Sequence, residues 1–226
     1  RMWYDNCIGN IFVLGLVMED SAEKYLENIN NDCRNGIAHG ILVANLSYEL
    51  AIRMGLSEDR AYKIKCAGMV HDIGKLKLTE YLYGRNSRSM SIMEIKYMRT
   101  HSKIGYDCLV KMGVSEDVCQ IVLRHHECMD GSGYPDNLSG EEIPYEARIL
   151  SVVDEFAALI SDRPYRKAFD LETAIQIMID EVKNYDLGIF LQFQRFIHEP
   201  EALDLINNSK IDLDDLDIRG ILEVDG

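Results

Sequence analysis

Apolar residues recur at helical intervals along most of the chain. Residues 37–54 form a long amphipathic stretch in which apolar positions are available for a core, and Gly55 follows as a C-terminal cap: Ile41, Ala44, Leu46, Tyr48, Leu50, Ile52. The strict alternation of apolar and polar residues that marks β-strands is absent. The pattern predicts an all-α fold, a helical bundle.

Cap residues mark the starts of several helices. Ser57, Ser91, Ser115 and Asp170 each precede a helical stretch, and Ser91 with Glu94 matches a capping box. We predict further helices over residues 2–18, 23–31, 58–72, 92–101, 102–112, 116–126, 145–160, 171–183 and 187–198. One long glycine-rich loop, residues 130–140, separates two of them.

Charge and cysteine usage narrow the function classes. The net charge of −14 argues against binding to nucleic-acid backbones, although a local basic pocket or metal ions can still hold a small phosphate ligand. Six scattered cysteines without C-x-x-C spacing indicate reduced thiols of a cytoplasmic protein. No apolar run approaches the ~20 residues that span a bilayer, so we expect no membrane span in this chain.

The candidate chemistry lies in adjacent pairs of polar residues. The pair His71-Asp72 follows an apolar run, and the expected helix ends just after it, near Gly74 and Lys75. His125-His126 forms a second pair. Adjacent residues on a helix point about 100° apart, so one metal is hard to chelate with both. At a helix end they can serve two neighbouring metals, which suggests a cluster bridged by Asp72. Taken singly, His39 and His101 are each more typical of a packed or surface histidine than of a metal ligand.

These motifs resemble a known family. The matching segments are His71-Asp72-Ile73-Gly74-Lys75, His125-His126-Glu127, Asp130-Gly131-Ser132-Gly133-Tyr134-Pro135, Ile143-Pro144, Ala147-Arg148-Ile149-Leu150 and Ser161-Asp162-Arg163-Pro164-Tyr165-Arg166. In this order and spacing they resemble the HD-GYP domain of the HD phosphohydrolase superfamily, over roughly residues 21–199. The resemblance implies an HD-type helical bundle with metal ligands at helix ends. It also implies a metal-dependent phosphodiesterase that hydrolyses cyclic di-GMP to linear pGpG or GMP.

The resemblance implies a set of site residues. The metal ligands would be His39, His71, Asp72, His101, His125, His126 and Asp154. A water between two cations would be the nucleophile, since metal binding lowers its pKa from 15.7 to about 7. Iron or manganese is favoured, with zinc, nickel or magnesium as alternatives.

Around this cluster the resemblance adds residues that would contact the substrate or a ligand. Lys75 would act with Asp72 in catalysis by stabilising a phosphate or donating a proton; a surface lysine is the alternative. Tyr134, Arg163 and Arg166 would contact the substrate, the alternatives being a loop anchor for Tyr134 and a salt-bridge partner for Arg163. Glu127 would orient a histidine.

Two positions depart from the family pattern. Asn35 stands where members with three metals have a glutamate, so we predict two metals. Ala157 stands where a second aspartate is usual. This second change favours an alternative, a weakly active or inactive signalling module that binds a dinucleotide or a partner protein. A phosphohydrolase for another nucleotide, such as a mixed cyclic dinucleotide, is a further alternative, since nothing in the sequence distinguishes guanine from adenine.

The expected domain organisation has three parts. Residues 1–20 would be a leading helix that links to an upstream domain or makes a homodimer contact, residues 21–200 the HD-GYP domain, and residues 201–226 an acidic extension. A diguanylate cyclase with a GGDEF domain, or another signalling protein, would be a partner.

Overall fold

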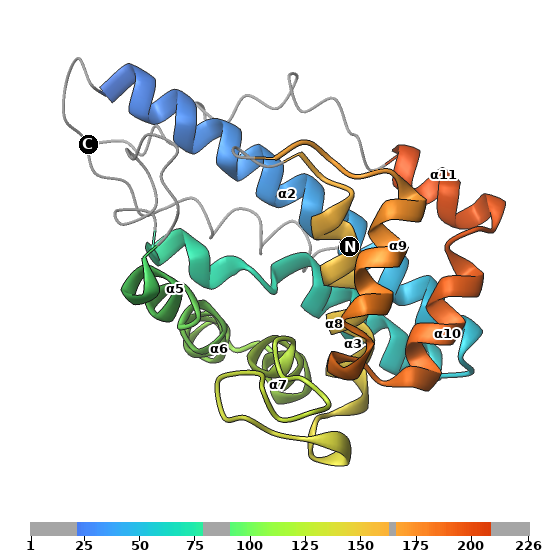
Figure 1. Ribbon diagram of the computed structural model, residues 1–226. Coiled ribbons are helices and arrows are strands. Elements are labelled where there is room, and N and C mark those ends of the chain that lie inside the picture. The colour runs from blue at the N-terminus through green and yellow to red at the C-terminus, as the bar shows by residue number, and fades with distance from the viewer. Residues whose placement is uncertain (1–21, 79–90, 163–165, 209–226) are drawn as a thin grey trace. The chain divides into compact units, whose positions relative to one another are not determined.

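The computed structural model describes residues 22–78, 91–162 and 166–208, with side chains from Arg34 onward. Its helices are α2 (Ala22–Arg53), α3 (Glu58–Val70), η1 (Ile73–Leu78), α5 (Ile92–Met98), α6 (His101–Lys111), α7 (Glu116–Arg124), η2 (Gly140–Glu142), α8 (Tyr145–Leu159), α9 (Leu171–Asp180), η3 (Val182–Asn184), α10 (Leu187–Phe196) and α11 (Pro200–Asn208). No β-strand occurs in these residues, and the all-α prediction is confirmed (Figure 1). The expected leading helix and most of the acidic extension lie outside them.

The chain divides into two compact units. Residues 36–210 form the larger one, and residues 1–35 with 211–226 form the other, of which only residues 22–35 are described. Helix α11 belongs to the larger unit, and its Ala202 is completely buried in the hydrophobic core. The domain boundaries expected at residues 20 and 200 stay predictions.

Most predicted caps are present. The Ser57 side chain accepts from the Arg60 backbone, Asp170 accepts from Thr173, and Ser91 forms the predicted capping box. The side chain of Ser115 makes no capping hydrogen bond, which corrects that prediction. The two helices expected over 23–31 and 37–54 are one helix, α2. Gly36 lies between the two expected ranges, and a glycine inside a helix costs only about 1 kcal/mol, so the helix continues through it.

Helix α8 lies at the centre of the larger unit. It packs against α3, α7, α9 and α10, as its gold ribbon in Figure 1 shows. Its inner face is completely buried, and the ring of Phe156 meets that of Phe193 edge to face at 5.0 Å. Because α8 is fixed on several sides, any polar side chain that it directs toward α3 and α7 is held at a defined position. No described helix meets the length and hydropathy needed to cross a membrane.

Candidate metal centre

The structure brings all the sequence-predicted ligands together in two neighbouring groups. One group consists of Asp72, His101, His125 and His126, and the other of His39, His71 and Asp154. Within each group the ligand atoms lie within 4.8 Å of one another. The sixth histidine, His198, is exposed and belongs to neither group.

The groups are assembled from helix ends and from the interiors of α2 and α8. His71 caps the C-terminus of α3, His101 begins α6, and His125 caps the C-terminus of α7. His39 comes from within α2, and Asp154 from α8. The expectation that ligands gather at helix ends is therefore met for these three histidines, while two ligands project from helix interiors.

Two glycines allow α2 and α3 to approach backbone to backbone. A Cβ on Gly40 would lie 2.7 Å from the Met69 carbonyl oxygen, and a Cβ on Gly68 would lie 2.9 Å from the Ala44 Cα. Any larger residue would push the helices apart. The close packing sets the rings of His39 and His71 5.2 Å apart, centroid to centroid.

Three of the histidines are oriented by the turn of chain that precedes them. Nδ1 of His71 donates to the Gly68 carbonyl at 2.8 Å, Nδ1 of His101 to Met98 at 2.7 Å, and Nδ1 of His125 to Val122 at 2.6 Å. A carbonyl only accepts, so the proton sits on Nδ1 and Nε2 of the neutral ring is available to a metal. Sequence reasoning missed these bonds. In all three cases the acceptor is the carbonyl three residues before the histidine.

Several buried ligand atoms have no hydrogen-bond partner. They are His39 Nδ1, His71 Nε2, Asp72 Oδ1 and His125 Nε2. Buried polar atoms are rarely left unpaired, so each such atom calls for a partner of another kind. Imidazole nitrogens and carboxylate oxygens together suit divalent transition metals. The residues present therefore fit divalent metal ions.

The charges of the centre are strongly coupled. Burial opposes protonation of His71, but the carboxylates of Asp72 and Asp154 outweigh it and raise its pKa to about 9. Burial also raises the pKa of both carboxyls, yet Lys75 and His71 hold that of Asp72, and His71 and His39 that of Asp154, well below the usual range. Burial lowers the pKa of His126 to about 3. Ionised carboxylates and a neutral His126 are the protonation states that metal binding requires, whereas His71 would have to release its Nε2 proton when a metal binds.

Lys75 and Tyr134 both reach this centre. Lys75 Nζ donates to Asp72 Oδ2 at 2.6 Å. The Tyr134 ring stacks on His126 at 4.7 Å between centroids, with 27° between the ring planes. Burial, followed by the charges of Asp154 and Asp72, raises the pKa of the Tyr134 phenol, so it stays neutral.

The loop that carries Tyr134 needs a glycine before it. A Cβ on Gly133 would lie 2.5 Å from the Glu127 Cα and 2.6 Å from the His126 carbonyl oxygen. With glycine there, the Tyr134 N–H donates to the same His126 carbonyl at 3.1 Å. The Gly-Tyr sequence thus fixes the ring against the histidine.

Glu127 supports this loop and does not orient a histidine, in contrast to the expectation. Its buried carboxylate accepts the backbone N–H groups of Asp136 at 2.8 Å and Leu138 at 3.0 Å. Arg124 lies 3.6 Å from one of its oxygens and also pairs with Asp136. The carboxylate is used to hold backbone, which the motif did not reveal.

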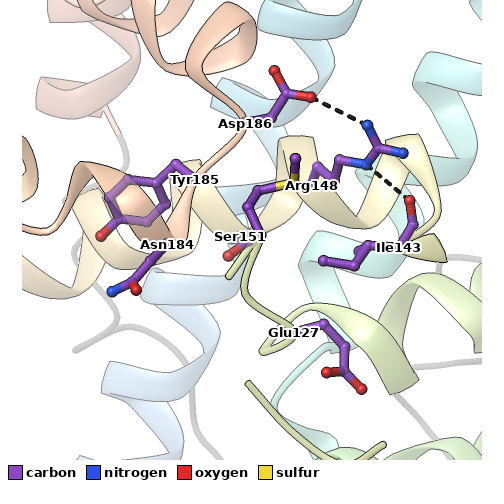
Figure 2. A pocket seen from close by; sticks show the side chains of 8 residues that line it. Glu127, Ile143, Arg148, Ser151, Asn184, Tyr185 and Asp186 are labelled. Carbon is purple, nitrogen blue, oxygen red and sulfur yellow. Dashed lines mark hydrogen bonds and ion pairs between the residues drawn. The ribbon is translucent and has the colours of Figure 1, made fainter. Parts of the chain in front are cut away.

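The residues at the two ends of the loop are tied to the C-terminal helices. The Met129 N–H donates to the Asn184 carbonyl at 3.0 Å. Arg148 on α8 donates from Nε to the Ile143 carbonyl at 2.8 Å and from a terminal nitrogen to Asp186 at 3.2 Å, as Figure 2 shows. The hollow that these residues line is too small to admit a ligand. Its polar groups support the loop.

Two of the predicted substrate-binding residues, Arg166 and Arg163, are not seen at the centre in the described part of the chain. The Arg166 guanidinium donates to the carbonyls of Leu159 and Ala158, both at 2.9 Å, and lies over the Phe169 ring. It caps the C-terminus of α8, and its role in substrate binding stays a prediction. Arg163 lies outside the described residues.

The two positions that depart from the family pattern also differ in their surroundings. Ala157 is completely buried in the hydrophobic core, while Asn35 is exposed.

Comparison with known proteins gives a consistent relationship. The model of the HD domain family matches residues 17–189. A cyclic di-GMP phosphodiesterase response regulator of Xanthomonas campestris is 41% identical over 56% of this chain and 34% of its own length. A 3'3'-cGAMP-specific phosphodiesterase of Vibrio cholerae is 35% identical over 64% of this chain and 33% of its own length. The chain thus spans about a third of these relatives.

Solved structures share the fold. An HDG"Y"P protein from Bdellovibrio bacteriovorus matches with a TM-score of 0.57 at 22% identity, covering 71% of this chain and 52% of that one. A cyclic GMP-AMP specific phosphodiesterase of V. cholerae matches with a TM-score of 0.57 at 16% identity, covering 85% of this chain and 52% of that one. With the family match over most of its length, the chain belongs to the HD domain family. Its motifs at residues 71–75 and 125–135 resemble those of the HD-GYP branch.

Proposed function

We propose that this chain is a metal-dependent phosphodiesterase that hydrolyses a cyclic dinucleotide, cyclic di-GMP in the first place, to linear pGpG or GMP. The observation that carries the proposal is the convergence of seven ligand side chains, from positions 39 to 154, on two groups that adjoin at Asp72. The names of the relatives, which include cyclic di-GMP and 3'3'-cGAMP phosphodiesterases, support the substrate class.

Two divalent metals would be held, one by each group. Asp72 is the natural bridge, because its Oδ2 lies 3.5 Å from Nε2 of His71 and its Oδ1 lies 3.5 Å from Nε2 of His101. The two oxygens of one carboxylate thus face the two groups. Iron or manganese is favoured by the mixture of imidazole and carboxylate ligands. When bound, the metals supply Lewis acidity and lower the pKa of water toward neutrality.

The remaining residues of the centre would bind and orient the phosphodiester. The ammonium group of Lys75 lies at the edge of the centre and is held there by its ion pair with Asp72. In this position it would stabilise the negative charge of the phosphodiester. The ring of Tyr134 covers His126 and excludes water from that side. The neutral phenol is a hydrogen-bond donor to a phosphate oxygen.

A mixed cyclic dinucleotide is the second candidate substrate, favoured by the 35% identity to the 3'3'-cGAMP-specific enzyme. An inactive signalling module is less well supported. The methyl group of Ala157 fills part of the hydrophobic core, and the seven candidate ligands are present without a carboxylate at this position. A homodimer contact through residues 1–20, a GGDEF-domain partner and a cytoplasmic location stay predictions.

Product analysis tests the proposal. The protein is incubated with cyclic di-GMP or 3'3'-cGAMP and Mn²⁺ or Fe²⁺ without oxygen, and linear products are separated by chromatography. We expect linear product from one or both substrates; none from either, at full metal occupancy, would refute the proposal.

Metal analysis tests the site. We expect two metals per chain, and fewer in His71→Ala and Asp72→Ala, whereas His198→Ala should keep both because this histidine is exposed outside the centre. Three metals in the wild type, or unchanged content in the first two variants, would contradict the ligand assignment.

A further inference from the structure

A cation stands beside the aromatic ring that covers the metal centre. The guanidinium carbon of Arg99 lies 5.2 Å from the centroid of the Tyr134 ring, and that ring stacks on His126. Arg99 directly follows helix α5 and lies two residues before His101. Its position is therefore fixed by the same turn of chain whose Met98 carbonyl orients the His101 ring.

Arg99 has no carboxylate partner among the described residues, in contrast to three other cations near the centre. Lys75 pairs with Asp72, Lys103 pairs with Asp107 at 3.0 Å, and Arg124 pairs with Asp136. Arg99 is also exposed to solvent. A guanidinium that rests on an aromatic ring and is free of carboxylates keeps its planar fork available to an anion.

The substrate class supplies two anions. A cyclic dinucleotide contains two phosphodiesters, each with one negative charge, and only one of them is cleaved in a given step. The phosphate that reacts must reach the ligands and Lys75. The other phosphate lies elsewhere on the same small ring and needs a cation beside the centre, not within it. Arginine binds phosphate oxygens bidentately, so it fits this requirement better than a lysine would.

We propose that Arg99 binds the second, uncleaved phosphate of the dinucleotide and thereby selects cyclic dinucleotides over substrates with one phosphate. This rests on the proposed function. Tyr134 has a double role in this arrangement, because its ring packs on His126 and holds the Arg99 side chain at the same time. Arg166 does not compete for this role while its guanidinium is bonded to the carbonyls of Ala158 and Leu159.

Equilibrium binding tests the role of Arg99 separately from turnover. A hydrolysis-resistant phosphorothioate analogue of cyclic di-GMP is titrated into the metal-loaded full chain by calorimetry. Loss of a charge-assisted contact predicts about 10- to 100-fold weaker binding in Arg99→Gln, and Arg99→Lys should lose less because it keeps the charge. The matched control is Arg53→Gln, since Arg53 also lies over an aromatic ring, 4.8 Å from the Phe196 centroid, but belongs to the end of α2.

A probe with one phosphate separates the second phosphate from a general effect. GMP should bind the wild type and Arg99→Gln equally, and the metal content of the two proteins should be equal. Unchanged binding of the analogue to Arg99→Gln, an equal loss for GMP, or a loss of metal would each overturn the assignment. Wild-type protein that binds the analogue but cleaves no cyclic dinucleotide would refute the proposed function alone, whereas a wild type that does not bind the analogue would refute both.

Discussion

Gly74, in the His71-Asp72-Ile73-Gly74-Lys75 motif, offers a sharp test of how the centre is packed. A Cβ added to it would lie 2.8 Å from the Gly105 backbone nitrogen and closer still to the His101 carbonyl oxygen. Non-bonded atoms prefer about 3.5 Å or more, so η1 and α6 would have to separate by more than about 1 Å at the His101 carbonyl. Both obstacles are backbone atoms, which cannot turn aside as a side chain can.

The expected cost of Gly74→Ala is therefore at the upper end of overpacking substitutions, about 3 kcal/mol of unfolding free energy. With a urea m-value of about 2 kcal/mol/M, the unfolding midpoint would fall by about 1.5 M. The measurement is urea unfolding followed by circular dichroism, in a chelator so that metal binding does not contribute.

Gly105→Ala is the matched control on the other side of the same contact. Its added Cβ would meet the Val122 Cγ1 at 3.4 Å, a side-chain atom that can shift, and the helix would gain from the alanine. We expect its midpoint to stay close to that of the wild type. Equal midpoints for Gly74→Ala and Gly105→Ala would refute the reasoning that backbone contact at residue 74 requires glycine.

Three further outcomes are expected. Glu127→Ala should leave the loop N–H groups of Asp136 and Leu138 unpaired and speed their hydrogen exchange at least about tenfold; unchanged exchange would contradict the anchoring role. Arg166→Lys should lower stability through the lost caps on α8 while leaving metal content intact, which unfolding and metal analysis would check. The metal-free protein should be most stable near pH 6.5. Below that pH, His126, with its folded pKa of about 3, takes up a proton more readily when unfolded. Above it, the stability from His71, complete below 6.5, is lost as the pH rises through its folded pKa of about 9. A monotonic pH profile would contradict this.

Sequence patterns located His71-Asp72 and His125-His126, because metal-binding residue types are rare in apolar surroundings and occur here as adjacent pairs. His39, His101 and Asp154 were assigned only through the family resemblance. The helices were also predictable, since apolar periodicity and caps such as Ser91 are local signals. The link between Asp154 and His39, whose side chains meet at 2.9 Å across 115 residues of chain, came only through the family resemblance.

Other features depend on backbone proximity that a sequence does not display. Glu127 was expected to orient a histidine, but its carboxylate holds the loop, because the loop folds back and presents two N–H groups to it. Arg166 likewise meets the end of α8 only after the chain has turned. The contact of Arg99 with Tyr134 joins residues from separate segments, and neither residue alone signals it.

The bonds from His71, His101 and His125 to the carbonyls three residues earlier have a consequence for assembly and design. Each ring is aligned by the end of the helix that immediately precedes it, so the alignment requires no contact with the other ligands. Only the helices have to meet. A four-residue unit ending in histidine at a helix terminus is thus a self-contained, transferable ligand. Placed on the converging helix ends of an unrelated helical bundle, it would present its Nε2 in advance of any metal.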